Sequence, residues 1–311
     1  MHPVARALRS ARRHLRNTIH FTILFLLFLL AADPSPSAET CASTWLERLN
    51  FYRATAALPP VSEAPSLSAP LTLHARYMVM HNVIAHSEKQ RHSWATPEGA
   101  EAGAVSNLAG SFSDSEPDTW AVDTWMQAPF HAIGIIDPAL QHVGFGIHRA
   151  HRGKIQTAAG LDVIRGRAAV APASVAYPIV WPADGAAVPL AEGIGEYPNP
   201  LSSCNGYKTP TGLPLIVQMG SGERVPHVTR TSISEGERPL EHCVFDEGTY
   251  RNGNKVQQRL GRSILAARDA IVLIPRKPLT PDFRYRAIIE VSGQRIDWTF
   301  TVSNPATSAS R

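Results

Sequence analysis

The hydrophobic pattern of the chain changes near residue 170, and this change limits the folds that the chain can adopt. Before it, apolar residues recur every three or four positions, as on one face of the helix predicted over residues 67–84. After it, short apolar runs alternate with turn residues, which is typical of a β sandwich. Four prolines, at positions 172, 178, 182 and 189, mark the change. A chain of 311 residues is long enough for one domain on each side.

The same patterns predict the individual elements. In the first part we expect helices over 42–56, over 67–84 and from about 116 to 128, with a long loop over 87–105. Residues 143–147 and 155–163 are predicted to form a β hairpin. In the second part the predicted elements are all strands, at 213–219, 226–233, 271–274, 285–291 and 298–302.

The N-terminus has the pattern of a secretory signal peptide. Five arginines lie before an apolar run of about 12 residues at 21–32, which is too short to span a bilayer. Small residues follow, so we expect cleavage after Ser37 or Ala38. The mature protein is then secreted, periplasmic or attached to the cell surface, with no stable membrane span. An uncleaved anchor and a lipoprotein modified at Cys41 are the alternatives.

Loss of this segment makes the protein formally neutral. Residues 1–38 hold five of the 30 Lys and Arg and one of the 26 Asp and Glu, so 25 of each sign remain. Binding to nucleic acid depends on an excess of basic groups that neutralise phosphates. We therefore expect no nucleic-acid partner.

The three cysteines are Cys41, Cys204 and Cys243. In an oxidising compartment we expect Cys204 and Cys243, which lie 39 positions apart in the second part, to form a disulfide. Closing such a loop stabilises the fold by roughly 4 kcal/mol in the chain-entropy model. Cys41 then stays free, pairs with another chain, or changes this pairing.

The most specific stretch of the first part runs from Trp125 to Gly146. It contains Trp-Met-Gln-Ala-Pro-Phe-His ending at His131, then Ile-Ile-Asp-Pro, then Val-Gly-Phe-Gly. This order and spacing resemble the bacterial CAP superfamily, relatives of the cysteine-rich secretory, antigen 5 and pathogenesis-related proteins. Weaker matches surround it, at Leu-Asn-Phe-Tyr-Arg over 49–53, at Leu-His-Ala-Arg-Tyr-Met over 73–78, at His86 and at Ser-Asn-Leu-Ala over 106–109. The resemblance covers about residues 42–165.

The resemblance implies a three-layer α/β/α sandwich with a cleft lined by two histidines and two glutamates. His86 and His131 match the histidines, but Ser106 stands where one glutamate is expected and Ala128 stands near the other. Glu88, Glu98, Glu101 and Asp123 are candidate replacements, and we take His86, His131, Ser106, Glu98 and Glu88 as candidates for the cleft. Two neutral imidazoles would hold a divalent metal such as zinc only incompletely, because zinc prefers four ligands.

The second part resembles, less specifically, bacterial immunoglobulin-like modules. The matching phrase is Pro-Leu-Thr-Pro at 278–281 with Tyr285, followed by Trp-Thr-Phe-Thr-Val at 298–302. We therefore expect an α+β protein: a signal peptide (1–38), a CAP domain (39–168), a Pro-rich linker (169–177), an all-β immunoglobulin-like sandwich (178–303) and a flexible tail (304–311). The second domain would act as a spacer or docking module.

Two functions remain open at this stage. The first is a non-enzymatic protein whose cleft binds a small apolar ligand or an extracellular protein partner. The alternative is a hydrolase, either a peptidase or a nuclease, that uses His86 and His131 with a metal or an activated water. The missing glutamates favour the first, because a general base or a metal shell is harder to build without them. The sequence contains no His-Glu-x-x-His, Gly-x-Ser-x-Gly or Cys-x-x-Cys motif, and the pair Gly193 and Gly195 indicates no phosphate-binding loop.

Overall fold

The computed structural model describes residues 44–304. The predicted signal peptide, Cys41 and residues 305–311 lie outside this range. Within it, no helix combines the length and the apolar character that crossing a membrane requires.

The first half is built on a four-stranded sheet with strand order β1-β3-β4-β2. Its strands are β1 (Ser62–Glu63), β2 (Ser106–Ser111), β3 (His142–Arg149) and β4 (Thr157–Asp162). Strands β3 and β4 form the predicted antiparallel pair, with Gly146 opposite Gly160, and β2 pairs antiparallel with the other side of β4. Only the short β1 runs parallel to its neighbour β3.

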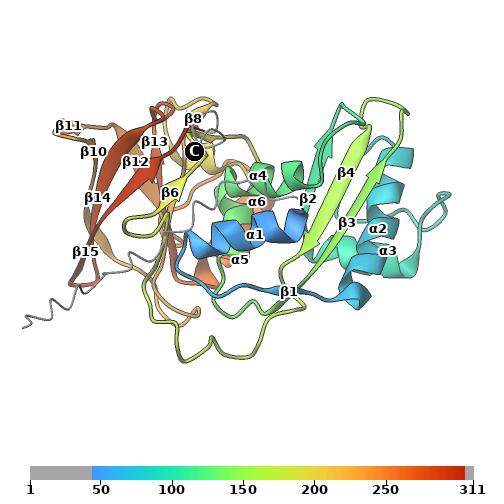
Figure 1. Ribbon diagram of the computed structural model, residues 1–311, viewed down its shortest axis with the longest axis horizontal. Helices are drawn as coiled ribbons and strands as arrows, with labels where there is room; N and C mark the ends of the chain where they lie inside the picture. The colour runs from blue at the N-terminus through green and yellow to red at the C-terminus, as the bar shows by residue number, and fades with distance from the viewer. Residues whose placement is uncertain (1–43, 305–311) are drawn as a thin grey trace, which may run out of the picture. The chain divides into compact units, whose positions relative to one another are not determined.

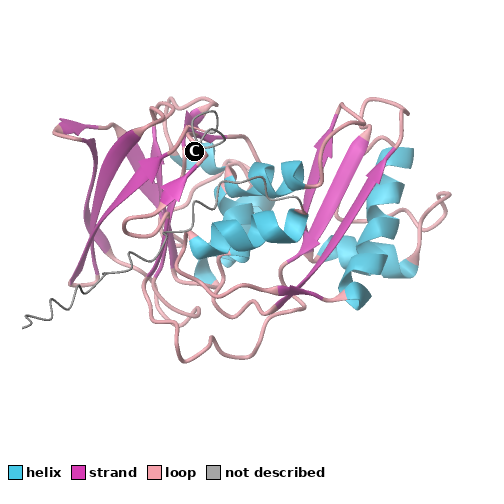
Figure 2. Cartoon of the chain, in the orientation of Figure 1, coloured by secondary structure: helices cyan, strands magenta, loops and turns pink. Residues whose placement is uncertain are grey.

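Helices cover both faces of this sheet (Figures 1 and 2). On one face lie α2 (Pro65–Met80) and α3 (Pro97–Ala104); on the other lie α1 (Trp45–Ala54), α4 (Thr119–Met126) and α5 (Pro129–Ile135). The α/β/α layering expected for this half is thus present.

The Val-Gly-Phe-Gly stretch of β3 explains how both layers pack closely. A Cβ atom on Gly146 would lie 2.2 Å from the backbone nitrogen of Thr72, and one on Gly144 would lie 2.4 Å from Leu67, so α2 rests directly on the strand. Phe145 points to the opposite face, where its ring stacks on Trp45 at 4.7 Å and meets Trp125 edge-on at 6.4 Å. Alternation along a strand places the two glycines on one face and the aromatic ring on the other.

One predicted loop contains a helix. Within 87–105, α3 begins after Thr96, whose hydroxyl accepts a hydrogen bond from the Gly99 amide, with Pro97 in the first turn. The glycine-rich sequence argued against a helix, but Gly103 is required by packing. A Cβ atom there would lie 2.3 Å from the ring of the buried His74.

The second half contains two larger sheets. One has the order β11-β10-β14-β15-β6 and consists of β6 (Ala187–Val188), β10 (Val228–Glu235), β11 (Arg238–Pro239), β14 (Phe283–Val291) and β15 (Gln294–Val302). The other has the order β12-β13-β9-β5 and consists of β5 (Ile179–Trp181), β9 (Leu215–Gln218), β12 (His242–Phe245) and β13 (Ala270–Pro275). A short ribbon pairs β7 (Glu192–Gly193) with β8 (Thr211–Gly212). All five predicted strands are present.

The expectation of an all-β second half is wrong, because this half also contains helical segments. Helix α6 (Lys255–Ala266) begins at Asn254, whose side chain accepts hydrogen bonds from the amides of Val256 and Gln257. Val256, Leu260 and Ile264 recur every four residues, which is a helical pattern that the prediction overlooked. Only Gly261 and Leu265 of this helix are buried. The immunoglobulin-like assignment stays a prediction.

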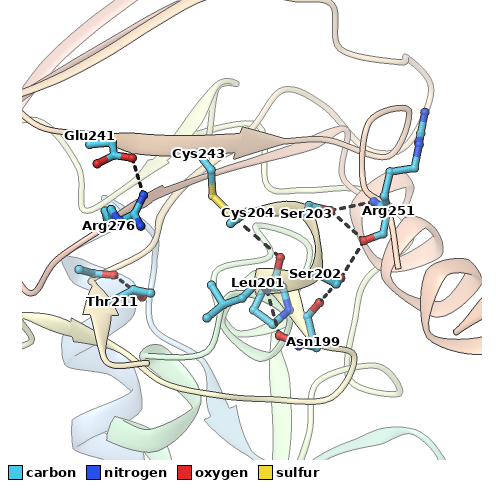
Figure 3. The surroundings of a disulfide bond; sticks show 12 residues. Asn199, Leu201, Ser202, Ser203, Cys204, Thr211, Glu241, Cys243, Arg251 and Arg276 are labelled. Atoms are coloured by element: carbon cyan, nitrogen blue, oxygen red, sulfur yellow. Dashed lines mark hydrogen bonds and ion pairs between the residues drawn. A yellow bond between two sulfur atoms is a disulfide. The ribbon is translucent and has the colours of Figure 1, made fainter. Parts of the chain in front are cut away.

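The predicted disulfide between Cys204 and Cys243 is confirmed (Figure 3). It links the residue after the 3₁₀ helix η1 (Pro200–Ser203) to β12, with the two Cα atoms 5.6 Å apart. Ser203 and Arg251 exchange hydrogen bonds beside it, which fastens η1 to the segment before α6. The disulfide thus ties the η1 segment, which follows β7 in the chain, to β12.

Buried contacts join the two halves, which belong to one compact unit. The ring of Phe130 packs on Phe245 and Tyr250, at centroid distances of 6.0 and 5.2 Å. The Trp181 indole donates a hydrogen bond to the hydroxyl of Thr55 at 3.0 Å. The side chains on both sides of the predicted linker form a single apolar core. The boundaries of the two domains stay a prediction.

Candidate functional site

His131 occupies the first turn of the short helix α5. Pro129 starts this helix, and the preceding residue, Ala128, has no side chain that can cap the free backbone amides. The His131 side chain is 16% exposed, so one part of the ring is held by the protein and another part is accessible.

The partner of His131 is Glu196, which follows β7 in the second half. Its Oε2 atom lies 2.6 Å from Nδ1 of His131 and also accepts the backbone amide of His131 at 3.2 Å. Its Oε1 atom accepts the amide of Phe130 at 2.9 Å. The carboxylate is only 2% exposed. Glu196 therefore caps α5 and orients the imidazole at the same time, and its negative charge suits the helix N-terminus.

His86 lies in the loop after α2 and lines the same two cavities as His131. Its Nδ1 donates a hydrogen bond to the carbonyl of Gly103 at 2.8 Å. Burial of the ring nitrogens lowers the pKa of His86, the charges of His131 and His74 act in the same direction, and the bond to Gly103 opposes them. The residue as a whole is nevertheless exposed, so solvent reaches part of the ring. The neutral imidazole is the favoured form, with its lone pair on Nε2.

Two cavities, of about 190 and 570 Å³, share His86, His131 and Tyr197 in their walls. The walls of the smaller cavity are otherwise mainly apolar and include Phe130, Val163, Leu260 and Ile264. The larger is bordered by apolar residues that include Ile84, Leu108, Trp125 and Ile194. We call these two cavities together the histidine groove. Both halves of the chain build it, because Ile194 to Tyr197 and α6 belong to the second half.

Two residues of β2, Ser106 and Asn107, line the smaller cavity of the groove. Ser106 is buried in the wall of the smaller cavity, and its hydroxyl donates a hydrogen bond to the carbonyl of Ala102 at 2.8 Å. The side-chain amide of Asn107 donates to the carbonyl of His131 at 3.1 Å. Asn107 thus holds the backbone of the histidine in place.

The acids proposed from the sequence do not line the groove. Glu88 is buried, where its carboxylate accepts from Nδ1 of His74 at 2.8 Å and from the amide of Thr96 at 2.7 Å. Glu98 is exposed in the first turn of α3. Glu101 lies 3.8 Å from Arg165, at the surface. Glu88 therefore has the bonding of a structural residue that anchors the start of α3.

Asp123 also bonds to residues that do not line the groove. Its carboxylate accepts from Arg48 and from the hydroxyl of Tyr52, each at 2.6 Å, and so ties α4 to α1. Of the candidates for the cleft, the structure brings together His86, His131 and Ser106.

The donor set around the two histidines does not fit a zinc ion with four protein ligands. Each Nδ1 is taken up by a protein oxygen, which leaves one Nε2 on each ring. Among residues 44–304, no group of three or more His, Cys, Asp or Glu side chains is arranged to hold a metal. Metal binding by the two Nε2 atoms alone stays a prediction.

Sequence reasoning missed Glu196. The residue follows Gly193-Ile194-Gly195, a pair of glycines that we gave no role, and it lies 65 positions from His131. A glutamate in a turn after a glycine pair has no local pattern that identifies it as a partner for a histidine. The candidate replacements named from the sequence, Glu88, Glu98, Glu101 and Asp123, all lie in the first half.

Residues 46–157 match the sequence model of the Cysteine-rich secretory protein family, CAP. The match begins in α1, ends at the start of β4 and includes both groove histidines, whereas Glu196 lies outside it. No curated protein matches the chain.

Proposed function

We propose that this CAP superfamily protein is exported and binds a small, largely apolar ligand in the histidine groove. Export is supported by the basic and apolar N-terminal sequence and by the disulfide, which forms in oxidising compartments. One observation carries most of this proposal: two mostly apolar cavities both have His86 and His131 in their walls. Concave sites with apolar walls and a few convergent polar groups are typical of small-molecule binding.

The hydrogen bond of Ser106 supports binding over nucleophilic catalysis by this residue. Ser106 stands at the position where the resemblance implies a glutamate. The proton of its hydroxyl is used in a hydrogen bond to the carbonyl of Ala102. A serine nucleophile needs a neighbouring base to accept that proton. Within the described residues the hydroxyl makes no such bond to an imidazole.

The groove can be blocked at one glycine without disturbing the backbone. A Cβ atom on Gly195 would have only the Thr209 methyl within 4 Å, at 4.0 Å, and Gly195 borders the larger cavity. A Gly195→Phe side chain therefore has room at the border of the larger cavity, and we expect it to narrow the entrance. Gly253 is a matched control, because nothing lies within 4 Å of its Cβ position and it is exposed.

The test is titration with the fluorescent apolar probe 2-naphthol. We expect saturable binding by the wild type and by Gly253→Phe, and at least tenfold weaker binding by Gly195→Phe. Equal affinity in all three proteins, or no saturable binding by the wild type, contradicts the proposal.

A second candidate, hydrolysis, is favoured by the Glu196–His131 pair. A buried carboxylate that orients an imidazole is the arrangement by which hydrolases hold a general base. The assay would use labelled casein for peptidase activity and supercoiled plasmid for nuclease activity. Cleavage by the wild type that is lost in His131→Gln supports this candidate; equal rates in both proteins, or none, contradict it.

A further inference from the structure

Within the described residues, none of the first-half carboxylates proposed for the cleft contacts a groove histidine. Ser106 and Ala128 stand at the positions where the resemblance implies glutamates, and Glu88, Glu101 and Asp123 contact His74, Arg165 and Arg48. The carboxylate on His131 comes instead from Glu196, outside the residues that match the family.

We infer that Glu196 is a positioning residue that fixes the tautomer of His131, so that the second half of the chain completes the groove. Nδ1 of His131 lies 2.6 Å from a carboxylate oxygen that is a pure acceptor, so Nδ1 must carry the proton. The neutral ring then has its lone pair on Nε2, the reverse of the form that prevails for histidine in water. The partner of one ring nitrogen thereby sets the chemistry of the other.

The tautomer of His86 is fixed in the same way, with the proton on Nδ1. Its Nδ1 lies 2.8 Å from the carbonyl of Gly103, another pure acceptor, and the lowered pKa of His86 keeps the ring neutral. The two imidazoles therefore both offer Nε2 lone pairs, and both rings line the two cavities. Acceptors on two rings that line the same mostly apolar cavities fit a ligand that carries a hydrogen-bond donor, such as a hydroxyl or an N–H group.

This choice of ligand rests on the proposed function, whereas the tautomer does not. Two measurements test the tautomer and the ligand separately. The first reads the tautomer directly, from the ¹⁵N chemical shifts of the His131 ring at pH 8 in the full mature chain. We expect Nδ1–H in the wild type and mainly Nε2–H in Glu196→Ala.

Glu196→Gln separates positioning from a merely structural role. Its amide oxygen can take the place of Oε2 and still accept the proton of Nδ1, although its NH₂ group then faces the Phe130 amide. We expect Gln to weaken the cap of α5 but to preserve the Nδ1–H tautomer. Backbone amide shifts report whether each variant is folded, and the tautomer is compared only between folded proteins.

The second measurement compares 2-naphthol with 2-methoxynaphthalene, which has the same rings but no donor. We expect the wild type and Glu196→Gln to bind 2-naphthol about fivefold to tenfold more tightly, as one hydrogen bond provides. We expect this preference to be largely lost in Glu196→Ala, where Nε2 of His131 becomes a donor.

The outcomes are distinct. A His131 ring that carries its proton on Nε2 in the wild type, or whose tautomer is the same in Glu196→Ala, overturns the positioning role. A tautomer that depends on Glu196, together with no binding of either probe, supports the positioning role and refutes the proposed ligand function. Equal affinity for the two probes in the wild type refutes the donor-bearing ligand.

Discussion

Asp137 is the residue whose removal tests most directly how the two halves hold together. It follows α5 in the first half, and its carboxylate is 2% exposed. Its Oδ2 atom lies 3.0 Å from Nε and 2.9 Å from the terminal nitrogen of Arg268, a buried residue of the second half. Arg167 contacts the same oxygen at 2.6 Å but is one-third exposed. Burial lowers the pKa of Arg268, and the charge of Asp137 opposes that shift.

Loss of each ion pair should lower the free energy of unfolding by a different amount, because Arg268 is buried and Arg167 is partly exposed. Asp137→Ala leaves the guanidinium of Arg268 buried without its anion, which costs about 3–5 kcal/mol. Arg167→Ala removes an exposed partner and leaves the buried pair intact, so we expect a loss of about 0–1 kcal/mol. The two variants change the same carboxylate cluster and differ mainly in which charge is left unpaired.

The assay is urea unfolding of the disulfide-bonded mature chain at pH 7, followed by tryptophan fluorescence and circular dichroism. Because the halves share a core, we expect Asp137→Ala to lower the stability of both. A free energy of unfolding within 1 kcal/mol of that of Arg167→Ala would refute the reasoning about the buried pair. Two separate transitions, with only one of them shifted, would refute the coupling of the halves and support independent domains.

Four further predictions follow from individual contacts. The pKa of His86 is lowered on folding, so its neutral form supports stability fully above about pH 6.5 and that support is lost as the pH falls below it; urea midpoints should drop more between pH 7 and pH 5 in the wild type than in His86→Gln, and equal drops would contradict this. Replacing Cys204 and Cys243 together by serine should lower the free energy of unfolding by roughly 4 kcal/mol, and a loss below 1 kcal/mol would show that the bridge contributes little. Gly146→Ala should cost at least about 1–3 kcal/mol, because its methyl group would press on the α2 backbone; Gly253→Ala, where the space is open, is the control for the melting temperature, and similar values in both variants would contradict the packing argument. Proteinase K should cut within the predicted linker at 169–177, and the fragments should stay associated because of the buried contacts; fragments that separate while both stay folded would contradict the shared core.

Elements whose signals are local could be predicted from the amino-acid sequence alone. The Val-Gly-Phe-Gly strand, the amphipathic helix that became α2 and the alternating strands that became β14 and β15 are all fixed by residues within about a dozen positions. The disulfide was also predictable, because export and only three cysteines restrict the choices. Helix α6 was missed although its pattern is also local: Val256, Leu260 and Ile264 recur at helical spacing, in a part of the chain whose other apolar runs predicted strands.

The surroundings of the two histidines depend on contacts between distant parts of the chain and could not be predicted. Glu88 is close to His86 in sequence, yet packing turns its carboxylate onto His74. Glu196 is 65 positions from His131, yet the shared core places it against the first turn of α5. A buried carboxylate must lie where amides and an imidazole can compensate the loss of water, and this requirement concerns neighbours in space. Neighbours in space that are distant in the chain leave no trace in a single sequence, so the groove became complete only when both halves were folded together.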